Sequence, residues 1–210
     1  MKKEVKAIIL DLGGVILNID YQRTIRAFEL LLKNGANVEA FYTQAKQNQV
    51  FDLFEKGEIS AADFRTDLKK IFGLQLSDHG IDEAWNAMLL DLPLERLTFV
   101  SELRKKYPVY LLSNTNEIHY QAFRKNLEET FDNPSILEDF FDKTYYSHLI
   151  KQRKPTAAAF NHVLDDNQLN AYEVVFVDDS AQHIEGAMSL GIDARLLVNS
   201  SLSTLCQDLL

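Results

Sequence analysis

Apolar residues gather in runs that predict buried strands. Four segments, 5–12, 107–114, 173–179 and 193–199, are apolar over most of their length. Such runs are typical of parallel strands, because these are covered on both faces of their sheet. The segment 141–150, FDKTYYSHLI, predicts a fifth strand.

Helical stretches lie between these runs, at 94–107, 155–166 and 180–191, and Gly191 suits a C-cap of the last one. A chain that alternates strands with helices makes right-handed crossovers, which keep the strands parallel and put the helices on the faces of the sheet. The sequence therefore predicts an α/β fold with a Rossmann-like parallel sheet flanked by helices.

The region from Tyr21 to Leu92 breaks this alternation, since its apolar spacing is helical and it contains no convincing strand. Ser60 and Asp63 form a capping pair at the start of one of its helices. We predict a core of residues 1–18 and 93–210 and a helical cap of residues 19–92 that covers the ends of the strands. The helices expected in this cap are 27–35, 38–57, 60–73 and 81–93.

Composition and charge narrow the class of partner. The chain has 210 residues and a formal net charge of −9, so neither nucleic acid nor an anionic membrane is an expected partner. No apolar run approaches the length of a membrane helix, and the start lacks the features of a secretory signal. The single cysteine, Cys206, cannot form an internal disulfide. We expect a cytoplasmic protein with Cys206 as a small apolar filler.

Candidate chemistry begins at Asp11, which follows the apolar residues 7–10 of the first run and precedes Gly13 and Gly14. Ligands of open α/β sheets bind beyond the carboxyl ends of the strands, where Asp11 is predicted to lie. The two glycines permit a sharp turn or a close approach of backbone to ligand. Read alone, Asp11 is better explained as an acid that caps a turn after a strand, so the rest of the chain decides its role.

Polar residues also end the second run, and another precedes the helix at 155–166. Ser113 and Asn114 offer a hydroxyl and an amide that suit phosphate oxygens, although both are also common turn residues. Lys154 stands before Pro155, where its ammonium can point at an anion in the crevice. An isolated lysine is more often solvated, so only the combination with other signals favours a site.

Two adjacent acids, Asp178 and Asp179, end the run at 173–179. Neighbouring carboxylates at a partly buried edge repel each other, and a cation relieves that repulsion. Oxygen ligands with few protein partners favour Mg²⁺ completed by water and phosphate. The alternative, in which one acid caps the next helix and the other is solvated, is equally open for this pair alone.

Taken together, these signals resemble the haloacid dehalogenase-like hydrolase superfamily. DLGGV matches its first motif, Ser113 its second, Lys154 its third and VDDS its acidic fourth, while the insert resembles its helical cap. EKGEIS, LLSNTN and RKP are most similar to a subgroup of bacterial sugar-phosphate phosphatases related to α-D-glucose-1-phosphate phosphatase. The resemblance implies a phosphatase that acts on a small phosphorylated metabolite such as a sugar phosphate.

The same resemblance implies the roles of the acids. Asp11 is the expected nucleophile and forms an aspartyl-phosphate that water hydrolyses. Mg²⁺ is the expected cofactor, held by Asp11, the backbone carbonyl of Gly13, and Asp178 or Asp179. Lys154 then balances the charge of nucleophile and phosphate.

For the phosphate itself, the resemblance implies hydrogen bonds from Ser113 and from the backbone of Asn114. One departure concerns Gly13, where phosphatases of this superfamily usually have a second aspartate as general acid and base. A cap carboxylate or His183 is a possible replacement, although a histidine on a helix is more often solvated.

Two other functions stay open at this point. A carbon-halogen hydrolase of the same superfamily also uses Asp11, but it needs no metal and lacks the paired acids. A catalytically inactive member that binds a phosphorylated ligand or a protein is favoured only by Gly13. The retained acids, Ser113 and Lys154 favour a phosphatase over both.

Overall fold

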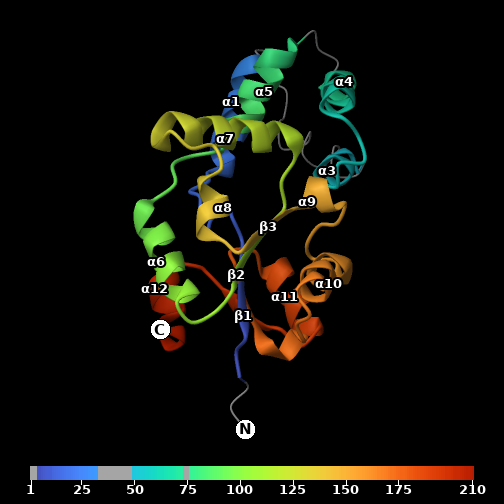
Figure 1. The fold of residues 1–210 in the computed structure, drawn as a ribbon. Helices are drawn as coiled ribbons and strands as arrows, with labels where there is room; N and C mark the ends of the chain where they lie inside the picture. Colours follow the sequence, from blue (N-terminus) through green and yellow to red (C-terminus); the bar gives the residue numbers. More distant parts are fainter. Residues whose placement is uncertain (1–3, 33–48, 73–75) are drawn as a thin grey trace.

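Five parallel strands form the centre of the computed structural model, which describes residues 4–32, 49–72 and 76–210. The strand order is β3-β2-β1-β4-β5. Figure 1 shows strands of this sheet at the centre of the molecule. The predicted α/β fold is therefore confirmed, although each strand is shorter than the run that predicted it. The expected fifth strand ends at Tyr146, because Ser147–Ile150 form a helical turn instead. The strands are β1 (Ala7–Leu10), β2 (Val109–Ser113), β3 (Lys143–Tyr146), β4 (Val174–Asp178) and β5 (Asp193–Leu196).

Helices cover both faces of this sheet, which explains why its central strands are continuously apolar. Ile8 and Leu10 of β1 pack in one apolar cluster with Leu97 of α6, whereas Ile9 packs in another with Phe160 of α10. Alternate residues of a strand point to opposite faces, so both sets are buried. The helices around the sheet are α6 (Leu94–Arg104), α8 (Ile136–Phe140), α9 (Ser147–Ile150), α10 (Ala157–Asp166), α11 (Ala181–Ser189) and α12 (Leu202–Leu205), with short 3₁₀ helices at Ala171–Glu173 and Gln207–Leu209.

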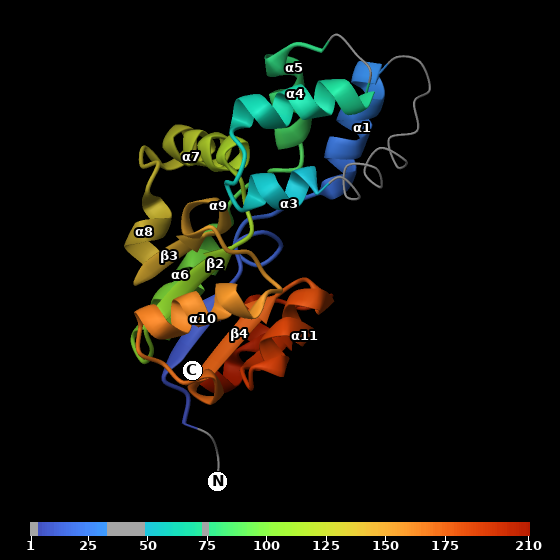
Figure 2. The same cartoon turned by 90° about the vertical axis from the view of Figure 1, so that its right-hand side faces the viewer.

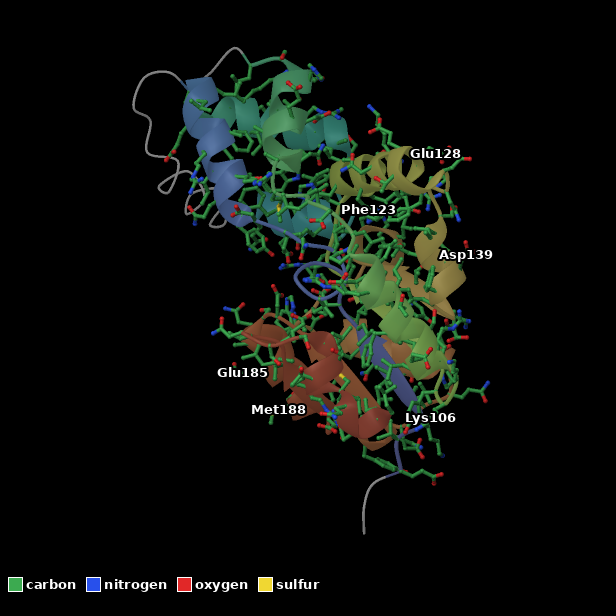
Figure 3. The ribbon with its side chains drawn as sticks, turned by 90° about the vertical axis from the view of Figure 1, so that its left-hand side faces the viewer. Lys106, Phe123, Glu128, Asp139, Glu185 and Met188 are labelled. Atoms are coloured by element: carbon green, nitrogen blue, oxygen red, sulfur yellow. The ribbon has the colours of Figure 1, made fainter. Side chains whose placement is uncertain are left out.

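One long helix, α7 (Glu117–Phe131), was not predicted. The side chain of Asn116 caps its start by accepting a hydrogen bond from the backbone N–H of His119 at 3.0 Å. Its apolar residues serve two different neighbours, since Ile118 packs among the cap residues and Phe123 packs in the core. Figure 3 shows α7 between the cap and the rest of the core. Because it buries residues on two sides, the helix has no single apolar stripe for the sequence to reveal.

The region after β1 forms the expected helical cap (Figure 2). The capping pair is confirmed, since the backbone N–H of Asp63 donates to Ser60 Oγ at 3.1 Å. The first cap helix begins at Tyr21, six residues earlier than predicted. The last one ends at Asn86, so residues 87–93 of the predicted helix do not belong to it. Much of the expected helix at 38–57, and part of 27–35, lie outside the described residues. The cap helices described are α1 (Tyr21–Leu32), α3 (Val50–Glu55), α4 (Ala61–Phe72) and α5 (Asp78–Asn86).

Two adjacent linkers join the cap to the core. The backbone N–H of Asn18 donates to Asp91 O at 2.9 Å, and that of Leu90 donates to Asn18 O at 3.0 Å. The carboxyl ends of the strands face the cap above them (Figures 1 and 2). The exact domain boundaries at 18/19 and 92/93 stay a prediction. Within the described ranges, no helix has both the length and the apolar character needed to cross a membrane.

Candidate active site

Asp11 follows β1 directly and stands at the edge of the sheet that faces the cap. Its side chain is buried to 10% exposure, and its backbone N–H donates to Val177 O on β4 at 2.9 Å. The chain then turns at Gly14, where φ is +74°. A Cβ at Gly14 would collide with the carboxylate of Asp179, so the turn and this close approach both require glycine.

Lys154 connects the acids of two strands. Its Nζ donates to Asp11 Oδ1 at 2.7 Å and to Asp178 Oδ2 at 2.6 Å, and its side chain is fully buried. Burial alone would lower the pKa of Lys154, but the two carboxylates outweigh it and raise that pKa. The simpler interpretation of Lys154 as a solvated surface lysine is therefore wrong.

The backbone of Lys154 is held by a residue from another strand end. Asn114 Nδ2 donates to Lys154 O, and Asn114 Oδ1 accepts from Lys154 N, both at 2.9 Å. This two-point clamp fixes the segment that carries the ammonium. The sequence placed Asn114 at the site but gave its side chain no such role, because the partner lies 40 positions along the chain.

Asp178 and Asp179 have different surroundings. Asp178 is fully buried, and its carboxylate accepts from Lys154, from the backbone N–H of Ser180 at 2.8 Å and from His183 Nδ1 at 2.9 Å. Burial would raise the pKa of Asp178, but Lys154 and His183 together hold it below the usual value. His183 is only 17% exposed, so the expectation of a solvated histidine is wrong.

Asp179 points instead toward the cavity beneath the cap. No hydrogen bond from another side chain reaches its carboxylate within the described part of the chain, and burial together with the nearby Asp178 raises its pKa. Ligand oxygens of Asp11, Asp178 and Asp179 lie within 4.8 Å of one another. This group of hard oxygen donors, with one carboxylate lacking a partner, fits a divalent cation such as Mg²⁺.

Ionisation of the Asp11 carboxyl costs free energy in this arrangement. Burial raises the pKa of Asp11 to about 6, with Lys154 opposing and Asp178 reinforcing the shift. A bound cation would lower this pKa again and keep the carboxylate ionised at neutral pH. The geometry thus favours cation binding next to Asp11.

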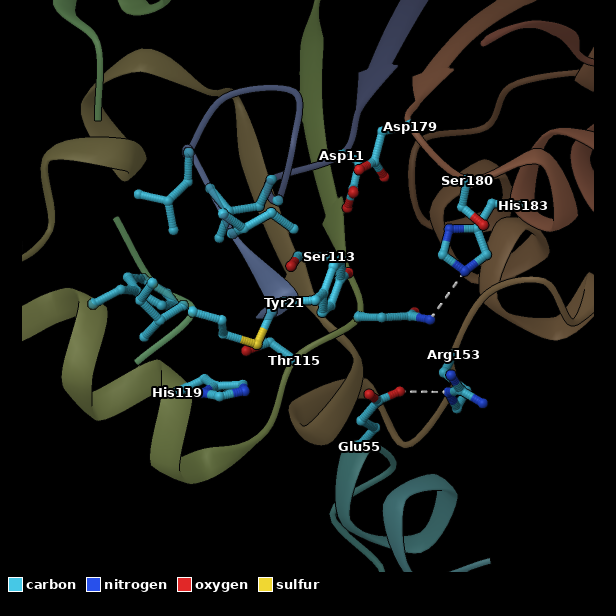
Figure 4. Close-up of a pocket in the computed structure, with 18 residues that line it drawn as sticks. Asp11, Tyr21, Glu55, Ser113, Thr115, His119, Arg153, Asp179, Ser180 and His183 are labelled. Atoms are coloured by element: carbon cyan, nitrogen blue, oxygen red, sulfur yellow. Dashed lines mark hydrogen bonds and ion pairs between the residues drawn. The ribbon is translucent and has the colours of Figure 1, made fainter. Parts of the chain in front are cut away.

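A cavity of about 250 Å³ lies between the sheet edge and the cap (Figure 4). Asp11, Ser113, Asn114 and Asp179 line it, as the sequence predicted. Lys154 and Asp178 lie behind this surface, fully buried. The remaining lining residues are Leu12, Gly13, Leu17, Ile19, Tyr21, Glu55, Met88, Leu89, Thr115, His119, Phe123, Arg153, Ser180 and His183.

Several of these residues were missed by sequence reasoning. Glu55 lies in EKGEIS and Arg153 in RKP, the segments that carried the resemblance, but neither received a role. Tyr21 begins α1, and His119 lies on α7. That these residues line one cavity with Asp11 depends on how the cap sits on the core, for which the sequence gives no local signal.

Gly13 lies in the cavity wall against Ile19. A Cβ at Gly13 would be 3.1 Å from Ile19 Cδ1, a tight contact that the flexible Ile19 side chain must relieve. The room for an aspartate at this position is therefore occupied in part by Ile19.

Comparisons with known proteins agree with this geometry. A family model described as haloacid dehalogenase-like hydrolase matches residues 5–191. A D-ribitol-5-phosphate phosphatase from Bacteroides thetaiotaomicron is 32% identical over 190 residues, which cover 90% of each chain. A haloacid dehalogenase (HAD) family enzyme from the same organism has a crystal structure in complex with magnesium and inorganic phosphate. Its sequence is 36% identical, and its structure matches with a TM-score of 0.81 over 96% of this chain and 98% of that one. A predicted HAD-like hydrolase from Porphyromonas gingivalis is 27% identical, with a TM-score of 0.79 and coverage of 95% and 94%.

Proposed function

The chain belongs to the haloacid dehalogenase-like hydrolase family, and on that premise we propose that its cavity hydrolyses the phosphate monoester of a sugar or sugar alcohol. It is a Mg²⁺-dependent phosphatase: one relative is a D-ribitol-5-phosphate phosphatase, and a similar HAD family enzyme is found in complex with magnesium and inorganic phosphate. The observation that carries the proposal is the buried Lys154, which links Asp11 at the cavity wall to Asp178. This arrangement supplies a carboxylate nucleophile beside a fixed positive charge.

Mg²⁺ would be held by Asp11, the backbone carbonyl of Gly13 and Asp179. We assign Asp179 as the ligand because it faces the cavity, whereas Asp178 already accepts hydrogen bonds from Lys154, Ser180 and His183. When bound, the cation neutralises charge that develops on the transferred phosphoryl group. The residues of the chain supply the rest of the chemistry.

In the first step, an oxygen of Asp11 attacks phosphorus and the bond from phosphorus to the ester oxygen breaks. The departing alcohol oxygen takes up a proton, and Asp11 becomes an aspartyl-phosphate. In the second step, water attacks the same phosphorus, the bond to Asp11 breaks, and inorganic phosphate leaves with one proton released. Gly13 has no side chain to carry these protons, so solvent or another cavity group supplies and accepts them.

Phosphate binding falls to the residues at the end of β2 and to Lys154. Ser113 lines the cavity with its hydroxyl, and the backbone of Asn114 is adjacent. Lys154 acts from behind Asp11, where its positive charge offsets both the nucleophile and the incoming phosphate. The two hydrogen bonds of Asn114 hold the backbone of Lys154 and so help to keep that charge next to Asp11.

The substrate class follows from the relative and from the cavity. D-ribitol 5-phosphate is the phosphate ester of a sugar alcohol. The phosphatase named for it matches this chain over 90% of the length of each. A cavity of about 250 Å³ with several polar side chains suits a small hydroxylated metabolite. An anomeric phosphate such as α-D-glucose 1-phosphate, indicated by the sequence resemblance, stays a prediction within the same class.

The test is phosphate release from a panel of sugar and sugar-alcohol phosphates, with and without Mg²⁺. We expect release only with Mg²⁺, and we expect Asp11→Asn to fold and bind ligand but to lose turnover, since an amide cannot form the aspartyl-phosphate. Halide release from a haloacid without metal would instead assign a dehalogenase. Binding of a phosphorylated ligand with no turnover by the natural chain would assign an inactive member of the family.

A further inference from the structure

An ion-pair cluster bridges the cap and the core beside the cavity. Arg153, which immediately precedes Lys154, contacts two acids of the cap helix α3. Its Nη1 lies 3.0 Å from Asp52 Oδ1, and its Nε lies 2.7 Å from Glu55 Oε2. Lys56 also pairs with Asp52 at 2.6 Å.

The two acids differ in what they face. Glu55 and Arg153 both line the cavity, whereas Asp52 does not (Figure 4). Asp52 makes hydrogen bonds with Lys56 and Arg153. Glu55 Oε2 and Arg153 Nε are shielded from solvent, and beyond their mutual ion pair neither atom has a hydrogen-bond partner in the described part of the chain.

Glu55 and Arg153 therefore have balanced charges but unmet hydrogen-bonding capacity. A buried polar atom without a hydrogen bond costs about 1–3 kcal/mol, so a ligand that supplies the missing bonds is favoured. Glu55 accepts and Arg153 donates. Of the common polar groups, a hydroxyl matches both at once, because it donates and accepts through the same oxygen.

We propose that Glu55 and Arg153 determine specificity by binding hydroxyl groups of the alcohol that leaves the phosphate. A hydroxyl donates to the carboxylate of Glu55, and the same or a neighbouring hydroxyl accepts from Arg153. This inference rests on the proposed phosphatase function and names the chemistry of its leaving group: a neutral, polyhydroxylated alcohol.

The pair also selects against other leaving groups. Burial already raises the pKa of Glu55, so its negative charge is poorly solvated. A carboxylate of the substrate next to Glu55 would add like-charge repulsion. An alcohol without hydroxyl groups would leave Glu55 and Arg153 unmatched. Esters of sugar alcohols are thus favoured over phosphorylated hydroxy acids and over plain aryl phosphates.

The experiment compares Glu55→Gln with Asp52→Asn, a matched control. Both changes remove one carboxylate from Arg153, but only Glu55 lines the cavity. The substrates are ribitol 5-phosphate, 3-phosphoglycerate and p-nitrophenyl phosphate, assayed with Mg²⁺. We expect Glu55→Gln to lower kcat/KM for ribitol 5-phosphate by about 10-fold to 100-fold, the loss typical of a hydrogen bond to a charged group.

The same variant should change kcat/KM for p-nitrophenyl phosphate less than about threefold, since that leaving group carries no hydroxyl, and should raise the relative rate with 3-phosphoglycerate. Asp52→Asn should leave the ratios between substrates unchanged. Free ribitol gives an independent reading. It should inhibit hydrolysis of p-nitrophenyl phosphate by the natural chain and inhibit Glu55→Gln less.

Three results would overturn the proposal. The first is an equal loss with all substrates in both variants, which would make the cluster a structural contact only. The second is an unchanged preference in Glu55→Gln and in Glu55→Asp, a smaller change that keeps the charge. The third is equal inhibition by ribitol. If the natural chain hydrolyses p-nitrophenyl phosphate in all these cases, the phosphatase function survives; if it hydrolyses no ester, both fail.

Discussion

His119 should make the folded protein sensitive to mild acid. It lies on α7 between cap and core, 8% exposed, with its ring stacked on Trp85 at a centroid distance of 5.1 Å. Its Nδ1 lies 2.9 Å from Asn86 Oδ1, an acceptor, so Nδ1 carries the proton of a neutral ring. Burial lowers the pKa of His119 from 6.5 to about 3.

The sign and size of the effect follow from proton linkage. Below pH 6.5 the unfolded chain binds a proton at His119 that the folded chain rejects, so stability falls as the pH drops toward 3. At pH 5 this costs about 2 kcal/mol, compared with about 0.2 kcal/mol at pH 7. The figure at pH 5 changes little if the folded pKa is a unit higher, since pH 5 lies above both values.

Urea unfolding at pH 7 and pH 5 measures this loss, followed by the fluorescence of Trp85, the one tryptophan of the chain. His119→Gln should be less stable at both pH values but should lose about 2 kcal/mol less between them. His79→Gln, at a histidine that is 83% exposed, should retain the natural pH dependence. An identical loss between pH 7 and pH 5 in His119→Gln and the natural chain would refute the reasoning.

Two further predictions concern the acids and the missing general acid. Asp179→Asn should weaken Mg²⁺ binding at least about tenfold in a calorimetric titration, with little change in stability. Asp178→Asn should instead cost about 3 kcal/mol of unfolding free energy, because it breaks the buried pair with Lys154. Equal effects of the two changes would show that the two acids do not have separate roles. Gly13→Asp should be combined with Ile19→Val, which removes the Cδ1 that lies close to Gly13. The double change should speed hydrolysis of alkyl phosphates about 100-fold or more and leave acetyl phosphate unchanged, because protonation helps most where the leaving oxygen is most basic. An equal gain with acetyl phosphate would show that the new aspartate does not act as an acid.

The sequence predicted the sheet and its polar edge well, because both depend on local patterns. An apolar run such as 173–179 identifies a strand, and parallel strands bring their carboxyl ends to one edge. Asp11, Ser113 and Asp179 could therefore be placed together without knowing any contact between them. Lys154 was added to this group because it precedes a helix and because the other polar signals accompany it, whereas its complete burial was not predicted.

Contacts between distant segments were not predictable in this way. The two acids at the end of β4 look alike in sequence, but the backbone turns Asp178 toward Lys154 and Asp179 toward the cavity. The approach of Glu55 to Arg153 depends on how a separate helical unit rests on the sheet. Neither feature leaves a periodicity or a motif, so only the folded arrangement reveals it.

The charges around Asp11 explain why the cation and the phosphate are expected to bind together. Asp11, Asp178 and Asp179 are three carboxylates, and Lys154 is the one lysine or arginine in contact with them among the described residues. When all are ionised, two negative charges remain uncompensated, and the raised pKa values of Asp11 and Asp179 reflect this excess. A phosphate dianion would add to it, whereas a divalent cation cancels it. Phosphate affinity should therefore depend steeply on Mg²⁺.

The ion-pair cluster between cap and core adds no net charge near Asp11, so its role differs from phosphate binding. Arg153 and Lys56 face Asp52 and Glu55, so the cluster has no net charge to offer a dianion. If Arg153 bound the phosphate, Glu55 would lose its partner and stay charged in a poorly solvated position, at a cost of several kcal/mol. A neutral hydroxyl can join the pair without separating it. The cluster is therefore better suited to the alcohol than to the phosphate, with the phosphate left to Lys154 and the cation.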